Sequence, residues 1–401
     1  MPDLDYQLFD FDNHYYEAED AFTRHGDEAV KGYVHWVAEG KKRRIMFGPS
    51  LHTAIPNPTF NPIGKPGAYH KRLKELAERG ERANFDVQSS YSELEALPEH
   101  YQNRDSRLHV MDDQGVERAV FFPTLGVGVD GLNPTDVAMT YKVFHAFNLW
   151  LDEDWGFDYR GRILSAPFIP MIDPVRAVEE LDFVIGRGAR IIAMRPGPAG
   201  GRSPADIAWD PFWARLNEAG VVAAYHGSAG PDVYSRMFTQ MWQQHGVSDP
   251  AYEHNLQAAL VGSRGMLDTS IALVLGNLFG RFPNVRVTSV ELGCEWVDYC
   301  LHVLDHAGGL IARNIEAFGT RVDELPSDVF RRHIWVSPFP EENVPGLVDA
   351  IGADRVLFGS DWPHLEGTPE PIDYMAHLNK LDGASVRRIM RDNALDLLPA
   401  H

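Results

Sequence analysis

Residues 8–14 read LFDFDNH, an apolar run that closes on acidic and imidazole side chains. Two later runs close in the same way, VVAAYH at 221–226 and RVLFGSD at 355–361. Short apolar runs of this kind are typical of buried β-strands. Polar side chains at the ends of such strands are typical of the catalytic mouth of an α/β barrel. The three runs therefore predict a barrel with a polar mouth.

Four residues at these strand ends are candidate metal ligands: Asp12, His14, His226 and Asp361. Asp12 and His14 are two positions apart, so on a strand both side chains point to the same face. Carboxylates and neutral imidazoles are ligands that Zn²⁺ and Mn²⁺ accept. We expect the four residues to hold one Zn²⁺ or Mn²⁺ ion per chain.

The strand pattern recurs along the chain. Eight segments rich in Val, Ile, Phe and Ala are bounded by Gly, Pro or charged residues. Several are apolar at consecutive positions, as in parallel sheets that are covered on both faces. The predicted strands are Tyr6–His14, Arg118–Pro123, Arg162–Ile169, Ala189–Arg195, Val221–His226, Val285–Glu291, His333–Ser337 and Arg355–Ser360.

Stretches with helical spacing lie between most of these strands. Residues 174–188 begin with Pro174, which suits a first helical turn, and end at Gly188, which suits a stop. Residues 211–220 and 295–318 are two further predicted helices. Repeated strand–helix alternation predicts an α/β fold, a (β/α)₈ TIM barrel. An open doubly wound sheet is the alternative, but no Gly-rich phosphate loop follows the first strand.

Two regions do not follow the repeat. Residues 40–105 are dense in Pro, Gly and Asn and predict a long loop with helices after the first strand, which we interpret as a lid. Residues 228–270 predict a helical insertion after the fifth strand. Its aromatic and Met residues indicate packing against the barrel or a subunit partner, or a wall of the substrate pocket. No linker forces a boundary, so we expect a single domain over residues 1–401.

Further polar or aromatic residues extend the candidate site. Glu291 ends VRVTSVE and can act as a general base or as a partner of the metal ligands. Arg195 ends IIAMRP and is expected either to clamp a substrate carboxylate or to pair with a carboxylate of the wall. We assign Trp296 and His364 to substrate binding as well.

The composition limits the partners. The 401 residues carry a formal net charge of −20, so the basic surplus that a nucleic-acid partner requires is missing. The two cysteines, Cys294 and Cys300, form no disulfide framework, which fits a reducing cytoplasm. No signal peptide and no run of about 18 apolar residues is visible, so we expect no membrane association.

On these motifs the chain resembles the amidohydrolase superfamily, and within it the branch of aminocarboxymuconate-semialdehyde decarboxylase and the resorcylate-type decarboxylases. FDFDNHYYE (9–17) resembles the first-strand metal motif of that family, and AAYHGS (223–228) resembles its fifth-strand histidine segment. RFPNVRVTSVELG (281–293) is similar to the entry into its sixth strand. VLFGSDWPH (356–364) is similar to its eighth-strand signature. The resemblance spans residues 9 to about 398.

The resemblance implies a (β/α)₈ barrel with a single Zn²⁺ or Mn²⁺ site in which His14, His226 and Asp361 are ligands. It also favours a homodimer. Two positions depart from the family pattern. The usual HxH is here Asp12-x-His14, and Glu291 stands where the family often has a histidine that acts as catalytic acid or base.

We therefore predict a metal-dependent enzyme that cleaves a C–C bond of a small aromatic or unsaturated carboxylic acid, by non-oxidative decarboxylation or by hydrolysis. Asp361, Glu291 and His226 are the catalytic candidates. A metal-dependent hydrolase of an amide, ester or lactone is the first alternative. A barrel that binds small ligands without catalysis is the second.

Overall fold

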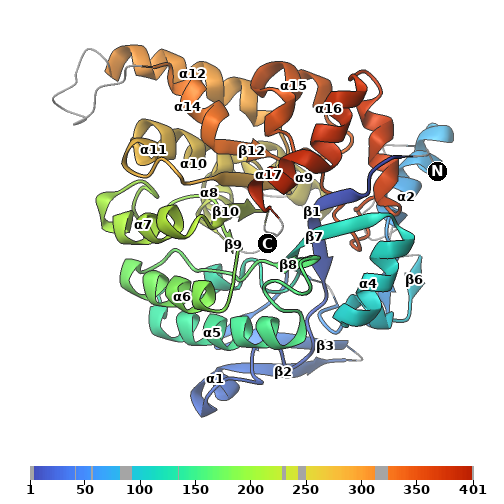
Figure 1. Ribbon diagram of the computed structural model, residues 1–401. Coiled ribbons are helices and arrows are strands. Elements are labelled where there is room, and N and C mark those ends of the chain that lie inside the picture. The colour runs from blue at the N-terminus through green and yellow to red at the C-terminus, as the bar shows by residue number, and fades with distance from the viewer. Residues whose placement is uncertain are drawn as a thin grey trace.

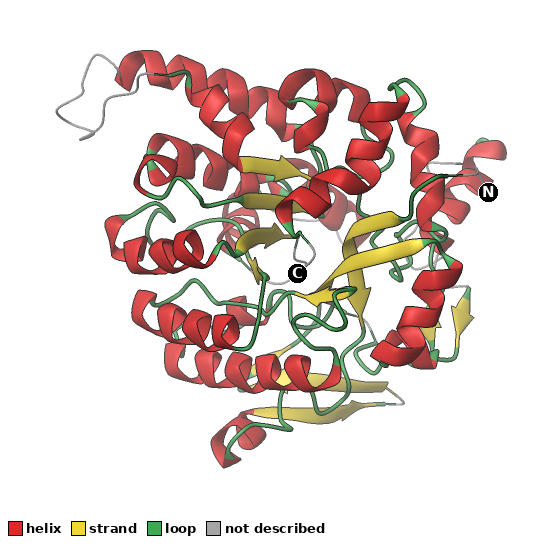
Figure 2. Ribbon diagram, in the orientation of Figure 1, coloured by secondary structure: helices red, strands yellow, loops and turns green. Residues whose placement is uncertain are grey.

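The computed structural model describes residues 4–40, 42–55, 57–81, 93–133, 135–227, 232–242, 250–311 and 324–399. The parallel strands lie in its interior, and helices cover them on the outside (Figures 1 and 2). A continuous cluster of buried apolar side chains includes residues from every parallel strand. The chain therefore has the mixed α/β content that the strand–helix alternation predicts.

The parallel strands form two sheets, ordered β1–β7–β8 and β12–β11–β10–β9. Every residue in these strands except Glu117 is buried, as expected for strands covered on both faces. Seven of the eight predicted strands are confirmed, with ends that differ by up to four residues. Their bounds are Leu8–Tyr15 (β1), Val116–Pro123 (β7), Ile163–Ser165 (β8), Ile191–Met194 (β9), Val222–His226 (β10), Val287–Val290 (β11) and Ile334–Val336 (β12).

Isolated backbone bridges link the two sheets, so the described strands do not form one continuous closed barrel. Phe168, beyond β8, pairs with Ala193 of β9. On the opposite side, Val336 of β12 pairs with Val356, and Asn13 of β1 pairs with Trp362. The segment 356–364 thus lies between the last strand of one sheet and the first strand of the other.

The prediction that Arg355–Ser360 forms a regular eighth strand is wrong. The first residue of this segment ends a short 3₁₀ helix, and only Val356 forms a ladder pair. The N–H of Phe358 donates to the carbonyl of Ile389, in a π-helical turn, instead of to a neighbouring strand. This competing partner prevents a regular ladder, although the segment stays apolar and buried.

Helices follow most of the parallel strands and lie on their outer side (Figure 1). The helix predicted at 174–188 is α6, and the helix predicted at 211–220 is α7, which ends at Gly220 with φ +65°. The helix predicted at 295–318 is α12 as far as Ile311, and residues 312–318 lie outside the described residues.

The helices of this outer layer, apart from the short α16, each bury part of their surface. They are α4 (Arg104–Asp113), α5 (Val137–Asp154), α6 (Pro174–Gly186), α7 (Asp210–Ala219), α10 (Arg264–Leu275), α11 (Leu278–Arg281), α12 (Trp296–Ile311), α14 (Pro326–His333), α15 (Val344–Ile351), α16 (Gly383–Arg387) and α17 (Asn393–Leu397). Short 3₁₀ segments are η2 (Glu99–Tyr101), η3 (Val129–Gly131), η4 (Ile207–Trp209), η5 (Ala353–Arg355) and η6 (Pro371–Leu378), and η7 (Arg388–Asp392) is the π-helical turn.

The segment between β1 and β7 contains a small antiparallel sheet as well as helices, so the prediction of a loop with helices was incomplete. Strands β2 and β3 pair over their whole length, and Ile45 and Phe47 of β3 are buried in the core. The elements of this segment are α1 (Glu28–Tyr33), β2 (Val34–Glu39), β3 (Lys42–Phe47), β4 (Ser50–Leu51), β5 (Ile63–Gly64), α2 (Ala68–Glu78) and β6 (Leu94–Glu95).

Two helices, α8 (Val233–Met241) and α9 (Pro250–Val261), follow β10. Tyr234 and Phe238 of α8 and Val261 of α9 form a small apolar cluster of their own. The stretch Leu256–Leu275 is long and apolar enough to cross a membrane by length and composition alone. This stretch runs from the second half of α9 to the end of α10. Of its most apolar 18 residues, 44% are buried inside the protein, so the stretch is weak evidence for a membrane span.

Candidate metal centre

The strand ends bring together Asp12 and His14 of β1 and His226 of β10. The Nε2 atom of His14 lies 3.3 Å from Oδ1 of Asp12, and Nε2 of His226 lies 3.5 Å from the same oxygen. One donor atom of each residue lies within 4.8 Å of the donor atoms of the other two. All three side chains are buried. The spacing of Asp12 and His14 thus places both on the same face, as predicted.

Several donor atoms of this cluster are buried without a hydrogen bond. Within the described part of the chain, Oδ1 of Asp12, both ring nitrogens of His14 and Nε2 of His226 have no hydrogen-bond partner. A buried polar atom without a partner costs about 1–3 kcal/mol. A divalent metal ion would satisfy this set of carboxylate and imidazole donors. The residues therefore fit a metal ion.

The ring orientation of His226 also suits a ligand. Its Nδ1 lies 2.8 Å from the carbonyl oxygen of Gly227, which can only accept a hydrogen bond, so we assign the proton to Nδ1. This assignment leaves the lone pair of Nε2 directed at Asp12 and His14. A backbone carbonyl that fixes the tautomer of a histidine is a common arrangement at metal sites.

Burial and mutual contacts set the charges in the cluster. Desolvation, reinforced by His364, lowers the pKa of His14 to about 3, so its ring is neutral at pH 7. Desolvation alone would raise the pKa of Asp12, but contacts with His14 and His226 outweigh it and hold the pKa below the usual range. A neutral imidazole and an ionised carboxylate are the forms that bind metal.

Asp361 joins the cluster from the segment 356–364. Its backbone N–H donates to the carbonyl of Asp12 at 2.8 Å, and its Oδ1 lies 3.3 Å from Nε2 of His14. The backbone of Asp361 is left-handed, with φ +54°, which turns the chain sharply at this position. Burial and the neighbouring carboxylate of Glu366 raise the pKa of Asp361 well above its usual range. The fourth predicted ligand thus contacts two others.

His364 lies closer to the cluster than its assignment to substrate binding implied. Its Nδ1 is 2.7 Å from Oδ1 of Asp361, and its Nε2 is 3.0 Å from Oγ1 of Thr124. Its ring stacks on that of His14, with 4.0 Å between the centroids. One donor atom each of His14, Asp361 and His364 lies within 4.8 Å of the others. His364 therefore positions Asp361 and borders the metal centre.

Glu291 lies on the other side of His226. It follows β11 instead of ending it and adopts a left-handed backbone, with φ +54°. Its Oε2 is 3.4 Å from Nδ1 of His226. Desolvation, together with the charge of Asp361, raises the pKa of Glu291 to about 8. A carboxyl group that keeps its proton near pH 7 can act as a general acid.

Two residues assigned to substrate binding have other partners. The guanidinium of Arg195 forms an ion pair with Asp130 of η3, and both side chains are about nine-tenths buried. This contact matches the alternative in which Arg195 pairs with a wall carboxylate, with Asp130 as that carboxylate. The indole of Trp296 is buried and donates to the carbonyl of Gly293 at 2.9 Å. Neither contact places these side chains in the cluster.

Asp10 supports the cluster and has no predicted role. Its buried carboxylate accepts hydrogen bonds from the hydroxyl and the N–H of Ser360 at 2.5 and 2.9 Å. It also accepts from the Asn13 amide at 2.9 Å and from the Asp12 N–H at 3.2 Å. Asp10 therefore connects β1 to the residue that precedes Asp361. The alternation of Asp10, Asp12 and His14 along the strand was the only signal in the sequence.

Arg107 of α4 donates hydrogen bonds to the same end of β1. Its buried guanidinium donates to Oδ1 of Asn13 at 2.7 Å and to the carbonyl of His14 at 2.9 Å. It also lies 4.4 Å from the ring of Trp362, the neighbour of Asp361. The sequence offered no signal for this role, because Arg107 is far from these residues along the chain.

Two cavities open beside the cluster. One, of about 210 Å³, is lined by Asp12, Glu291 and Asp361 among others. The second, of about 1040 Å³, is lined by residues that include Thr124 and His364. A substrate can therefore approach the candidate ligands from two sides of the Asp361–His364 pair.

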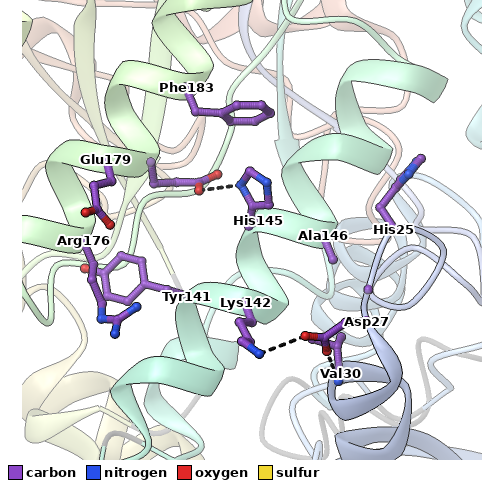
Figure 3. Close-up of a pocket in the computed structure, with 12 residues that line it drawn as sticks. His25, Asp27, Val30, Tyr141, Lys142, His145, Ala146, Arg176, Glu179 and Phe183 are labelled. Carbon is purple, nitrogen blue, oxygen red and sulfur yellow. Dashed lines mark hydrogen bonds and ion pairs between the residues drawn. The ribbon is translucent and has the colours of Figure 1, made fainter.

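A separate cleft of about 440 Å³ lies on the outer surface, between α5, α6 and the start of α1. Figure 3 shows Lys142 directed at Asp27 across this cleft, with 2.8 Å between Nζ and the carboxylate. His145 pairs with Glu180 at 2.9 Å. None of its lining residues belongs to the metal-ligand cluster, and each metal-ligand cluster found among the described residues includes Asp12 or Asp361.

The sequence pattern of the amidohydrolase family matches residues 97–400. The chain belongs to the amidohydrolase family. A solved amidohydrolase from Mycobacterium avium subsp. paratuberculosis K-10 is 40% identical, with a TM-score of 0.86 over 98% of this chain and 100% of that chain. The family membership expected from the strand-end motifs is confirmed.

Two further relatives of this amidohydrolase are decarboxylases by name. The gamma-resorcylate decarboxylase of Polaromonas sp. is 23% identical over 286 residues, which cover 68% of this chain and 79% of that protein. A dihydroxybenzoic acid decarboxylase from Polaromonas sp., solved with manganese and 2-nitroresorcinol, is 16% identical and covers 98% of this chain and 97% of that chain. Its TM-score of 0.59 shows that the two share a fold.

Proposed function

We propose that this amidohydrolase is a metal-dependent carboxy-lyase that removes CO₂ from a small aromatic or unsaturated carboxylic acid. The observation that carries the proposal is the convergence of Asp12, His14, His226 and Asp361, whose buried donor atoms include several without hydrogen bonds. The decarboxylases among the relatives favour this reaction over the others that the family is expected to catalyse.

The proposed ligands of one Mn²⁺ or Zn²⁺ ion are Asp12, His14, His226 and Asp361. The manganese bound to the Polaromonas decarboxylase favours Mn²⁺ as the first ion to test. When bound, the ion supplies positive charge that binds substrate oxygen and neutralises negative charge developing on it. His364 holds the Asp361 carboxylate in place through its Nδ1, and Thr124 holds the ring of His364 through its Nε2.

Glu291 is the proposed proton donor. Decarboxylation breaks the C–C bond to the carboxylate and leaves the electron pair on the substrate carbon, which must then take a proton. The raised pKa of Glu291 keeps its carboxyl protonated near pH 7, so it can supply that proton. The resulting carboxylate faces Nδ1 of His226 at 3.4 Å, which favours the charged product. Glu291 thus takes the role of the family histidine that is missing here.

Several further expectations from the sequence remain proposals. Arg195 and Trp296 stay predicted substrate contacts. We also propose that the two parallel sheets and the segment 356–364 act as one closed barrel in a single domain, with residues 40–105 as its lid and 228–270 as its helical insertion. A cytoplasmic homodimer that binds neither nucleic acid nor membrane remains our expectation.

Product analysis tests the reaction type. We would incubate the Mn²⁺-loaded protein with dihydroxybenzoic and dienoic acids in ²H₂O and in H₂¹⁸O. Decarboxylation predicts CO₂ release and one deuterium at the carbon that carried the carboxylate, without ¹⁸O in the organic product. Entry of ¹⁸O into an acid product would contradict decarboxylation and establish hydrolysis. Asp361→Asn should abolish turnover in either case, and an unchanged rate would exclude Asp361 from the site.

A further inference from the structure

The large cavity lies beside the candidate metal centre, and Glu366 lines both this cavity and the smaller one that contacts Asp12, Glu291 and Asp361. Thr124 and His364 line the large cavity. His364 contacts the carboxylate of Asp361, and Thr124 contacts the ring of His364. Tyr16 also lines this cavity and is fixed by a hydrogen bond from its hydroxyl to the carbonyl of Pro363 at 3.2 Å. The inner end of the cavity therefore includes His364, which contacts a proposed ligand.

The walls of this cavity are mainly apolar. The apolar side chains that line them include Ile55, Phe60, Ile63, Leu97 and Leu365. Phe60 is buried, and the other four are partly buried. A partly open apolar wall stays in contact with water until a ligand covers it, so burial of apolar ligand surface there is favourable.

Thr124 and His364 are polar residues at the inner end of the cavity, and other polar residues lie at its mouth. Lys42, Arg43 and Asn61 line it and are exposed, which marks the mouth. Arg43 is already engaged, with its guanidinium 2.5 Å from the carboxylate of Glu19. The wall between the mouth and His364 thus offers apolar contacts more than charge recognition.

The size of the cavity exceeds the needs of a single-ring acid. Pockets of about 300–1,000 Å³ typically enclose ligands of drug size. This cavity measures about 1040 Å³, whereas the cavity that contacts Asp12, Glu291 and Asp361 directly measures about 210 Å³. The smaller space suits the reacting carboxylated ring, and the larger space remains for the rest of the substrate.

We propose that the large cavity binds an apolar substituent, so that the substrate is a carboxylated ring or dienoic acid that carries a second ring or a branched apolar chain. This proposal rests on the proposed function for the position of the carboxylate. It makes Ile55 and Leu97 specificity-determining residues, because they line the path of the substituent.

Ligand binding to the metal-loaded full-length protein tests the proposal. We would compare 2-hydroxybenzoate with its phenyl-substituted derivatives, with phenyl at each free ring position, by isothermal titration calorimetry. At least one derivative should bind the wild type ten-fold or more tightly than the parent acid. Ile55→Trp and Leu97→Trp, which fill the wall at two different places, should each reduce this preference to below three-fold. Affinity for the parent acid should change less than three-fold.

Ile207→Trp is the matched control, because Ile207 is 76% exposed and does not line the cavity. It should keep the wild-type preference. The proposal is overturned if no derivative binds more tightly than the parent acid, or if the preference survives in whichever of the two wall variants folds. CO₂ release is measured separately. A derivative that binds through the cavity but loses no CO₂ supports this inference and counts against the proposed function.

Discussion

Asp10 is not a proposed ligand, but its hydrogen bonds support the candidate metal centre. Its carboxylate fixes the Asp12 N–H and both polar groups of Ser360. In Asp10→Asn an amide nitrogen replaces one acceptor oxygen. It then faces either the Ser360 hydroxyl and the Asn13 amide or the backbone N–H groups of Asp12 and Ser360. We expect Mn²⁺ affinity to fall about 10–100-fold, as for other residues that orient metal ligands.

A chelator competition assay measures this loss. Asp349→Asn is the control, because Asp349 is exposed on α15. The control should keep wild-type affinity. Equal Mn²⁺ affinity in Asp10→Asn and wild type would show that the metal centre does not depend on this link between β1 and the segment 356–364.

The buried carboxyl group of Glu17 should make the free energy of unfolding depend on pH. Three backbone N–H groups, of Thr124, Leu125 and Gly126, donate to its Oε1. Burial nevertheless raises its pKa to about 7, above the value of about 4.3 expected in the unfolded chain. Between these values the folded state binds more protons, so the free energy of unfolding falls as pH rises. Glu17→Gln should reduce this fall by about 3 kcal/mol.

Urea unfolding at pH 4.5 and pH 7.5 measures how far the free energy of unfolding falls between these two pH values. Glu179→Gln is the control, because Glu179 is exposed on α6. The control should show the wild-type dependence on pH. If Glu17→Gln shows it as well, Glu17 is not protonated in the folded protein at pH 4.5 to 7.

At this scale the sequence predicted which candidate ligands come together but not the residues that support them. Asp12, His14 and His226 end recognisable strand patterns, so their convergence followed from the fold class. The role of Arg107 depends on a three-dimensional contact with His14, 93 residues away in the chain. A single sequence contains no signal for such a contact.

Among the elements, the passage of the segment 356–364 beside β1 depends on Gly359. A Cβ atom there would lie 2.5 Å from Cβ of Asp12 and 2.7 Å from Oγ of Ser337. We expect Gly359→Ala to lower the free energy of unfolding by about 1–3 kcal/mol and to reduce metal content by displacing Asp12. Thermal unfolding and metal analysis measure both effects.

Gly383→Ala is the matched control, because a Cβ atom at the first position of α16 would meet nothing within 4 Å. It should unfold as the wild type does. Wild-type metal content and stability in Gly359→Ala would mean that the two elements can separate without cost to the site.

The elements also show where sequence patterns stop being informative. Seven parallel strands were recognisable because they are apolar on both faces. The eighth segment is equally apolar, but the N–H of Phe358 binds Ile389 instead of a strand. The β2–β3 hairpin escaped prediction because its strands are partly exposed and charged, as in VHWVAE and KRRIMF. Both outcomes depend on backbone partners, which composition does not specify.

For the whole molecule, the strand–helix alternation predicted an α/β architecture with the polar residues at one end of the strands. The family match over residues 97–400 and the 40% identical amidohydrolase structure agree with that prediction. The large cavity was not predictable, because its walls come from segments as distant as residues 55–63 and 364–366. The size of the substrate that fits therefore depends on how the chain folds and could not be predicted from the sequence.

The central claim is that this chain holds one divalent metal ion through Asp12, His14, His226 and Asp361. The most direct measurement is metal content by plasma mass spectrometry after loading with Mn²⁺ or Zn²⁺ and gel filtration. We predict about one ion per chain in the wild type and in His145→Ala, whose histidine lies in the outer cleft. We predict loss of the ion in His226→Ala. A wild type without stoichiometric metal, or His226→Ala with full metal content, would contradict this assignment.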